Sequence, residues 1–199
     1  MLKGRRLFLA GIAAVWLTGC AAPPQQEIDS ARAALEAAGR QEAATYAPDA
    51  WREAQAAFDA ASWELQAQAR KLAWTRSYDQ ARDQFEQTRL KAVWAKSAAE
   101  VARETARRSA EELIVEARAA LEAVKASAKH PPRRGHARAD ASAKATHLEA
   151  LSMGIDEAQQ SFEARDFLTA ALKAEAVKRQ IAELSGDVGQ AQAKKPTTS

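Results

Sequence analysis

The pattern of apolar and polar positions predicts helices along almost the whole chain. Apolar residues recur at steps of three and four over residues 27–38, which is the spacing of one helical face. The members of this face are Ile28, Ala31, Leu35 and Ala38. Gly39 follows at a position where glycine commonly ends a helix. The first predicted helix therefore covers residues 27–38.

The second predicted helix covers residues 48–74 and carries a heptad seam. Pro48 lies in its first turn, where proline is tolerated. Large and small apolar residues alternate along the seam, which consists of Trp51, Ala54, Phe58, Ala61, Leu65 and Leu72. This spacing is typical of helices that pack as in a coiled coil.

The third predicted helix covers residues 78–129 and begins behind a capping box formed by Ser77 and Gln80. Its seam repeats at steps of seven through Tyr78, Phe85, Ala92, Ala99, Ala106, Leu113 and Ala120. Only a short turn separates it from the second helix. We therefore predict that the two helices pair as an antiparallel hairpin.

The C-terminal part, residues 139–185, holds two further helical faces. The first consists of Leu148, Leu151, Ile155, Ala158 and Phe162. The second consists of Phe167, Ala170, Ala174, Val177, Ile181 and Leu184. A tight turn at 164–166 separates them, and Asp166 is placed to cap the last helix. Gly154 allows a bend in the helix that contains it, and the polar residues 186–199 predict a flexible tail.

Composition favours the same fold class. Alanine makes up about a quarter of the chain, and no stretch has the pattern of a strand. Alanine has the highest helix propensity but buries little area, so the core must be thin. We predict an all-α fold of elongated helical hairpins with coiled-coil-like seams. The long third helix is shared between an N-terminal bundle (27–129) and the C-terminal hairpin.

A short motif near the start of the chain carries the strongest chemical signal. A basic segment and an apolar run lead into Leu17-Thr18-Gly19-Cys20, which contains the chain's one cysteine. This order is that of a bacterial lipoprotein lipobox, so residues 1–19 are predicted to be a signal peptide cleaved between Gly19 and Cys20. Cys20 would carry a covalent lipid, and we expect no other cofactor. The alternative is an uncleaved anchor, although the apolar run is short for a membrane span.

The residues around the lipobox bear on export and location. Residues 20–26 form a short tether that keeps the folded part close to the membrane. Ala21 is not the aspartate that retains lipoproteins in the inner membrane of enterobacteria, so we expect the periplasmic face of the outer membrane, with the inner membrane as the alternative. Arg5-Arg6 resembles a twin-arginine signal, but no visible cofactor site requires folding before export, which favours the general route.

Removal of the predicted signal peptide changes the charge balance. The full chain has 29 Lys and Arg residues against 26 Asp and Glu residues, a formal net charge of +3. Lys3, Arg5 and Arg6 are the charged residues of the segment that is removed. The mature chain is therefore balanced, and a nucleic-acid partner loses its electrostatic support.

Large apolar residues also occur opposite the predicted seams. Trp63 and Trp74 are eleven residues apart, which places them on one face if both belong to the second helix. The third helix has a similar outward row, formed by Leu90, Trp94 and Val101. The sequence favours burial of these residues under another helix. The alternative is an exposed face for a partner or for a second copy of the chain.

Residues 130–138 form a basic linker between the two parts. The sequence favours a solvated linker. The alternative is that its arginines, Arg133, Arg134 and Arg138, contact anionic head groups or the phosphates of lipopolysaccharide. The chain's three histidines lack the spacing of a helical metal pair, and we expect no metal site. There is no glycine-rich phosphate loop and no catalytic triad pattern. We therefore assign no catalytic residue and expect no enzymatic activity.

Residues 28–99 resemble a known family. The matching elements are Ile28-Asp29-x-Ala31-Arg32-x-Ala34-Leu35, then Tyr46-Ala47-Pro48, then Ala54, Ala57 and Ala61, then Tyr78-x-x-Ala81. This order is similar to that of small Ala-rich lipoproteins of Gram-negative envelopes, a family catalogued as a domain of unknown function. Many of their genes lie beside those of OmpA-like peptidoglycan-binding proteins. Arg76-Ser77 departs from the Gly-Asp of that family's turn. The resemblance implies a helical envelope module with an OmpA-like partner.

These features together favour a structural role. We expect an outer-membrane-anchored periplasmic lipoprotein that acts as a helical scaffold or adapter for another envelope component. The alternative is a helical module that binds a peptide, lipid or glycan. A concave groove lined by Trp63, Trp74 or Trp94 would favour the binding module, whereas burial of these residues in a smooth rod would favour the scaffold.

Overall fold

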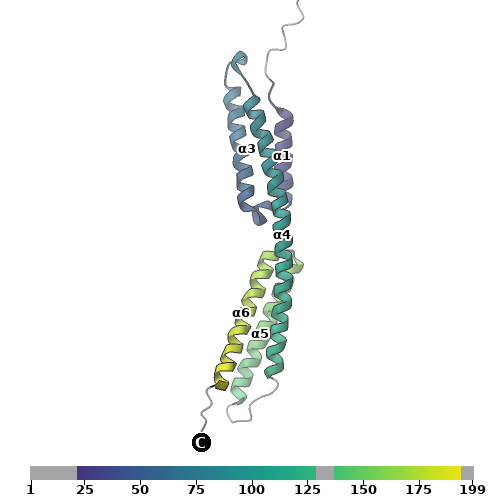
Figure 1. Cartoon of the computed structure of the whole chain (residues 1–199), viewed down its shortest axis with the longest axis vertical. Helices are drawn as coiled ribbons and strands as arrows, with labels where there is room; N and C mark the ends of the chain where they lie inside the picture. Colours follow the sequence, from purple (N-terminus) through teal and green to yellow (C-terminus); the bar gives the residue numbers. More distant parts are fainter. Residues whose placement is uncertain (1–21, 129–136, 194–199) are drawn as a thin grey trace, which may run out of the picture. The chain divides into compact units, whose positions relative to one another are not determined.

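A computed structural model describes residues 22–128 and 137–193, with side chains for 22–127 and 144–185. These residues form helices and no strand, which confirms the all-α prediction (Figure 1). The elements are α1 (Gln25–Arg40), α2 (Ala43–Tyr46), α3 (Pro48–Ala69), the 3₁₀ turn η1 (Ala73–Thr75), α4 (Asp79–Ala128), α5 (Ala137–Glu163) and α6 (Phe167–Ala193). The chain divides into two compact units. Unit 1 ends at Ala102 and unit 2 begins at Arg103, so α4 contributes to both.

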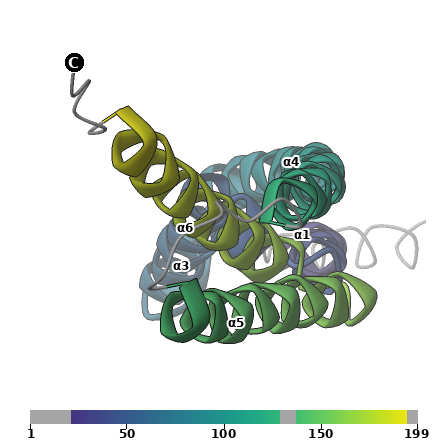
Figure 2. The same ribbon diagram turned by 90° about the horizontal axis from the view of Figure 1, so that it is seen from below.

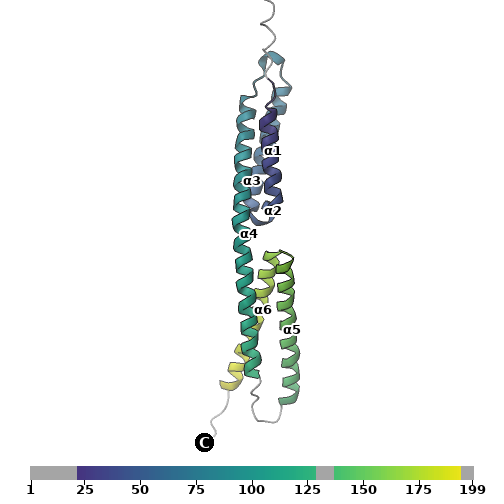
Figure 3. The same ribbon diagram turned by 90° about the vertical axis from the view of Figure 1, so that its right-hand side faces the viewer.

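Unit 1 is built from α1, α2, α3 and the first half of α4 (Figure 3). One core cluster consists of Ile28, Ala31, Ala61 and Phe85, with Phe58 and Leu65 packed against it. A second consists of Ala38, Ala43, Ala95 and Ala99, with Tyr46, Ala47, Ala50 and Trp51 packed against it. Phe58 and Phe85 meet edge to face, with ring centroids 5.6 Å apart. This contact joins α3 to α4, as the predicted hairpin requires.

The end of α1 differs from the prediction. The helix continues through Gly39 to Arg40, and the chain reverses at Glu42, whose φ is 58°. Backbone bonds from the Gln41 N–H to the carbonyl oxygens of Ala37 and Ala38 close the last turn. Gly39 therefore lies inside the helix, and the left-handed conformation that often falls on a glycine falls on Glu42, three residues later.

The end of α3 also differs from the prediction. The helix stops at Ala69, so Leu72 lies outside it and is exposed rather than part of the seam. The Arg76 guanidinium donates to the carbonyl oxygens of Ala69 (2.9 Å) and Lys71 (2.8 Å), which satisfies acceptors at the end of the helix. The connection to α4 is thus ordered by the Arg76 side chain, through contacts that helical periodicity does not reveal.

The predicted capping box forms only in part. Ser77 Oγ accepts a hydrogen bond from the Asp79 N–H (3.4 Å). The Ser77 N–H donates to Gln68 Oε1 on α3 (3.3 Å), not to Gln80. In a capping box, the side chain at the third helical position accepts a hydrogen bond from the N-cap N–H. Here Gln68 of α3 accepts that bond in place of Gln80.

Helix α4 runs for 50 residues, in agreement with the predicted long helix. Its buried positions in unit 1 are Tyr78 at the cap and Ala81, Phe85, Thr88, Ala92, Ala95 and Ala99. Those in unit 2 are Ala110, Ile114, Ala117 and Leu121. The predicted seam residues Leu113 and Ala120 are only half-buried, so the register has moved by one residue. The reason is geometric: a strict heptad drifts by about 20° per repeat on a 3.6-residue helix, nearly one position after four heptads.

Unit 2 is built from the second half of α4 with α5 and α6 (Figure 2). Its core consists of Ile114, Ala117, Leu121, Leu151, Ile155, Ala158, Ala174, Val177 and Ile181. The predicted cap is confirmed, because the Thr169 N–H donates to Asp166 Oδ1 (3.1 Å). Helix α5 ends in a Schellman arrangement, with Arg165 left-handed at φ 65° and the Asp166 N–H bonded to the Ser161 carbonyl (3.0 Å).

Three further features of unit 2 concern Gly154 and the bounds of α5 and α6. A Cβ atom at Gly154 would lie 2.7 Å from Val177 Cγ2, so this glycine permits a close approach of α6 to α5. Helix α6 continues past Gly186 to Ala193, where we predicted a flexible tail. Helix α5 begins at Ala137, so Arg138 belongs to a helix and not to the linker.

Candidate interaction surfaces

Several predicted site residues lie outside the part of the chain that the structure describes. Gly19 and Cys20 of the lipobox belong to residues 1–21, and Arg133 and Arg134 belong to residues 129–136. Arg138 is in α5, but its side chain is not described. Lipidation and anionic contact at these positions stay predictions.

An apolar row lies on the outer face of α4. We call it the α4 stripe: Leu90, Val93, Trp94 and Val101. These side chains are 46–68% exposed, on the side of the helix opposite Phe85, Ala92 and Ala99. The burial that the sequence favoured is therefore wrong, and the alternative of an exposed face holds for α4. Val93 was missed, although it lies three residues after Leu90, a spacing that makes the two side chains neighbours on one helical face.

Trp63 and Trp74 are also exposed, at 71% and 78%, but they do not join the α4 stripe. Trp74 lies in η1, so the assumption that it shares a helical face with Trp63 is wrong. The contacts Glu53–Lys91 and Phe58–Phe85 set the register of the hairpin.

That register places Trp63 level with Ala81 of α4. Trp94 is thirteen residues farther along, or about 20 Å at the helical rise. The structure therefore separates the predicted partner face into the α4 stripe, Trp63 on the outside of α3, and the turn that contains Trp74.

Ion pairs border the α4 stripe. Lys91 Nζ lies 3.2 Å from Glu53 Oε2, and Lys96 Nζ lies 3.6 Å from Glu100 Oε1. Arg89 Nε donates to Glu86 Oε2 (2.9 Å), and this hydrogen bond lowers the pKa of Glu86 below its ordinary value. Because these bordering charges pair locally, recognition at the stripe would depend mainly on apolar contact.

A charge network lies at the start of unit 2. Glu104 accepts hydrogen bonds from Arg107 Nε (2.9 Å, through Oε2) and Arg108 Nε (2.8 Å, through Oε1). These bonds lower the pKa of Glu104 to about 2. The Arg103 guanidinium lies over the Phe167 ring, 5.8 Å from its centroid. The geometry is that of a surface network that stabilises helices, with the Glu104 carboxylate ionised near neutral pH.

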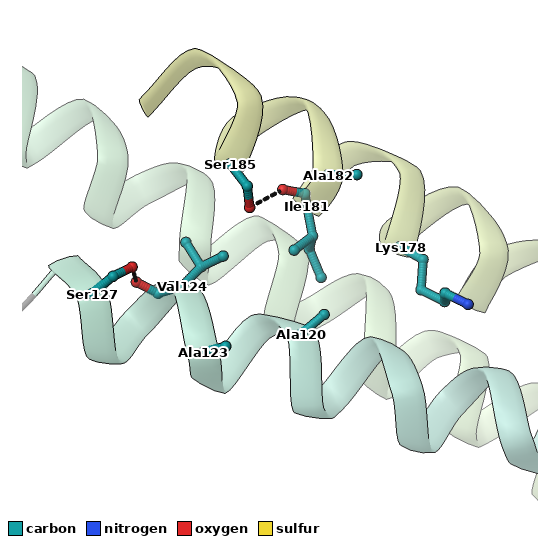
Figure 4. A pocket seen from close by; sticks show the side chains of 8 residues that line it. All are labelled: Ala120, Ala123, Val124, Ser127, Lys178, Ile181, Ala182 and Ser185. Atoms are coloured by element: carbon teal, nitrogen blue, oxygen red, sulfur yellow. Dashed lines mark hydrogen bonds between the residues drawn. The ribbon is translucent and has the colours of Figure 1, made fainter. Parts of the chain in front are cut away.

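Unit 2 also has an open groove of about 490 Å³ between the ends of α4 and α6. Figure 4 shows Ile181 of α6 pointing toward Val124 and Ala120 of α4. The remaining lining residues are Ala123, Ser127, Lys178, Ala182 and Ser185. Ser127 and Ser185 bond to backbone carbonyls of their own helices, and Lys178 pairs with Glu116. The groove is thus mainly apolar, and its polar groups already have partners.

The described residues lack two other kinds of feature. No group of three His, Cys, Asp or Glu side chains there is arranged to hold a metal ion. Among the described helices, none has the length and apolar character needed to cross a membrane.

The chain matches no protein-family model, no curated protein and no solved structure. Its own structure therefore defines its class. It is an α-helical bundle protein, with two compact units joined by a continuous helix and with exposed tryptophans in the first unit.

Proposed function

We propose that this chain is a lipid-anchored envelope protein that acts as a helical scaffold or adapter for another envelope component. The anchor is Cys20, within the lipobox described above. The lipid would hold the protein on the periplasmic face of the outer membrane. The helical units then present side chains to a partner.

The α4 stripe is the observation that carries the adapter role. Trp94 and Val101 are each 68% exposed, and the four members of the stripe follow one face of one helix. A helical row of this kind fits the groove or the helix of a partner. Tryptophan is also the residue type most often found at the energetic centre of protein interfaces.

The resemblance to Ala-rich envelope lipoproteins supplies a specific partner class. It suggests an OmpA-like peptidoglycan-binding protein encoded nearby. A protein that carries a lipid anchor and binds a peptidoglycan-binding partner would link the membrane to the cell wall. Self-association through the stripe is the competing use of the same surface.

Two experiments test this proposal. Cys20→Ala should abolish labelling by radioactive palmitate and release the protein from the membrane fraction, and persistent labelling would contradict the anchor. A photo-crosslinking amino acid in place of Trp94 should capture the partner in cells, while the same group in place of Leu172, a similarly exposed residue of unit 2, should not.

The double variant Trp63→Ala with Trp94→Ala gives a further check. Both side chains are at least 68% exposed, so their loss should leave helicity and melting temperature nearly unchanged. Partner capture should fall, because the double variant removes the aromatic anchor of the stripe. A large fall in melting temperature would show instead that these residues serve stability.

The groove in unit 2 supports a second candidate function, a module that binds an apolar ligand. It has about the size of a small-molecule site and an apolar lining. An Ala123→Trp variant would fill it. If fluorescent fatty acids bind to the protein and this variant abolishes binding while Val115→Trp, at an exposed position, does not, the binding module gains support.

A further inference from the structure

The connection between α3 and α4 exposes two large apolar side chains. We call residues 70–78 the α3–α4 turn. Leu72 is 60% exposed and Trp74 is 78% exposed, the largest fraction among the exposed large apolar residues of the described chain. Two large apolar side chains exposed within three residues of one turn form a small apolar surface, which can serve as a contact site.

Hydrogen bonds hold the α3–α4 turn in a defined conformation. The Thr75 N–H and Oγ1 both donate to the Leu72 carbonyl, each at 2.9 Å. Arg76 donates to the carbonyl oxygens of Ala69 and Lys71, and the Ser77 N–H donates to Gln68. The turn therefore presents its apolar side chains from an ordered backbone, which lowers the entropic cost of any docking.

The same end of unit 1 holds the start of α1. Arg82 Nε, in the first turn of α4, lies 3.1 Å from Glu27 Oε1 in the first turn of α1. Ile28 packs in one cluster with Phe85. Figure 3 shows the beginning of α1 and the α3–α4 turn at one end of this unit.

The chain between Cys20 and that end is short. Helix α1 begins at Gln25, five residues after Cys20. Five residues span at most about 18 Å. A lipid on Cys20 would therefore keep the α3–α4 turn within reach of the membrane surface.

The charges of the turn suit the same surface. Residues 70–76 (Arg-Lys-Leu-Ala-Trp-Thr-Arg) contain three cations and no acid. Arg70 and Lys71 are exposed and adjoin Leu72. Tryptophan prefers the interface of a bilayer, and Lys and Arg are attracted to anionic head groups.

We propose that the α3–α4 turn is a membrane-contact element, in which Leu72 and Trp74 enter the interface of an anionic phospholipid bilayer while Arg70 and Lys71 contact its head groups. This proposal rests on the lipid anchor of the proposed function. It fixes the direction of α4, which then leads away from the bilayer. Trp94 lies fifteen residues beyond Asp79, about 22 Å along the helix, and the α4 stripe stays clear of the lipid.

Depth-sensitive labelling of the full mature chain tests the proposal. A lipidated Cys20 has no free thiol, so Trp74→Cys introduces a single reactive site for an environment-sensitive dye. In vesicles of phosphatidylethanolamine and phosphatidylglycerol, the dye at position 74 should shift to shorter wavelength and be quenched by lipids with a nitroxide near the head group. The matched variant Trp94→Cys should show neither effect. If the dye at 74 behaves as the dye at 94, the proposal is overturned.

A charge test uses the dye at position 72, introduced by Leu72→Cys. Arg70→Gln with Lys71→Gln should lower the ratio of inserted to free turn about fivefold for each cation removed. Lys91→Gln with Lys96→Gln removes the same charge from the sides of the α4 stripe and should leave the ratio unchanged. An equal loss in both pairs would show that net charge alone binds the membrane, and would overturn the assigned role of the turn.

Failure of the anchor and failure of the turn can be told apart. Mass spectrometry of the N-terminal peptide reports the lipid on Cys20 directly. If Cys20 carries no lipid, the anchor fails, and the same dye measurements on a Cys20→Ala chain tethered by an N-terminal histidine tag to nickel-chelating lipid still decide the turn. If the lipid is present and the dye at 74 stays in water, the turn fails and the anchor stands.

Discussion

Unit 1 and unit 2 fill their cores with different side chains. In unit 1 most buried positions are alanines, and Phe85 is the largest fully buried side chain. In unit 2 the core is aliphatic, with Leu121, Leu151, Ile155 and Ile181 in one cluster. An alanine buries far less area than a leucine, so each buried position of unit 1 contributes less hydrophobic free energy.

The two units also differ in the kind of large apolar side chain that each exposes. Trp63, Trp74 and Trp94 are all exposed on unit 1. The exposed large apolar residues of unit 2 are aliphatic: Val115, Met153, Leu168 and Leu172. Three tryptophans of unit 1 thus lie outside its core, whereas Phe85 and Trp51 lie in it or pack against it. The difference indicates that unit 1 is the part of the described chain best suited to contacts with other molecules, and that unit 2 is suited to stability.

Core truncations should have the largest effects and should separate the two units. Phe85→Ala should lower the free energy of unfolding of unit 1 by about 3–5 kcal/mol, and Leu151→Ala should lower that of unit 2 by about 2–5 kcal/mol. Trp51, Trp63, Trp74 and Trp94 all lie in unit 1, so tryptophan fluorescence of the mature chain reports on that unit alone.

Chemical denaturation followed by fluorescence and by circular dichroism measures both variants. Phe85→Ala should shift the fluorescence transition. Leu151→Ala should leave the fluorescence transition unchanged and shift only the dichroism change that comes from the unfolding of unit 2. Equal fluorescence shifts in the two variants would show that the continuous helix α4 couples the units into one cooperative transition.

The next effect concerns the close contact of α5 and α6. Gly154→Ala would place a methyl group 2.7 Å from Val177 Cγ2. We expect it to destabilise unit 2 by about 1–3 kcal/mol through overpacking, despite the better helix propensity of alanine. Val177→Ala in the same chain should recover part of the loss, which a thermal melt measures. A Gly154→Ala variant as stable as the parent would contradict the close packing.

Gly39 in unit 1 should respond in the opposite direction. A Cβ atom there would lie 3.8 Å from Trp51 Cη2, an ordinary van der Waals distance. Since Gly39 lies inside α1, Gly39→Ala should raise the free energy of unfolding by about 0.5–1 kcal/mol through helix propensity. A denaturant melt followed by tryptophan fluorescence measures this change, and destabilisation would show that the Trp51 ring has no room to accept the methyl group.

The smallest effect concerns the exposed carboxylates. Hydrogen bonds from Arg107 and Arg108 lower the pKa of Glu104 in unit 2 from its ordinary value of 4.5 to about 2. A carboxylate whose folded pKa is depressed contributes stability above its unfolded pKa and loses it as the pH falls through the folded value. The small contribution of Glu104 should therefore be complete above about pH 4.5 and disappear toward pH 2.

Nuclear magnetic resonance titration of the Glu104 carboxyl carbon checks this. The midpoint should rise toward the ordinary value in an Arg108→Gln variant, because one of the two hydrogen bonds is lost. In unit 1, Glu86 should also titrate below its ordinary value, through Arg89. A Glu104 midpoint at 4.5 in the parent chain would contradict the hydrogen-bonded geometry.

Local pattern determined much of the fold by itself. The buried face of α1, the unbroken course of α4, the cap at Asp166 and the core positions of α5 and α6 all follow from helical periodicity and capping chemistry. These features depend on residues a few positions apart, which the sequence lists directly. The lipobox prediction rests on an equally local pattern, and it stays a prediction.

The remaining features of the fold depend on contacts that helical periodicity does not describe. Arg76 orders the turn after Ala69, and the meeting of Gly154 with Val177 depends on how closely two helices approach. The shift from Leu113 to Ile114 in the buried register of α4 arises from the mismatch between a heptad and a real helical turn. Exposure of Trp63 and Trp94 depends on which helices cover which faces.

The sequence alone thus determined that this chain forms helices and where most of them run, because helix formation is governed by neighbours along the chain. Only the tertiary structure decided that Trp63, Trp74 and Trp94 are exposed. It also decided that the predicted partner face is separated into distinct surfaces, and that Trp74 lies at the same end of unit 1 as the start of α1. The reason is that periodicity assigns a side chain to a face of its own helix, whereas packing decides what that face meets.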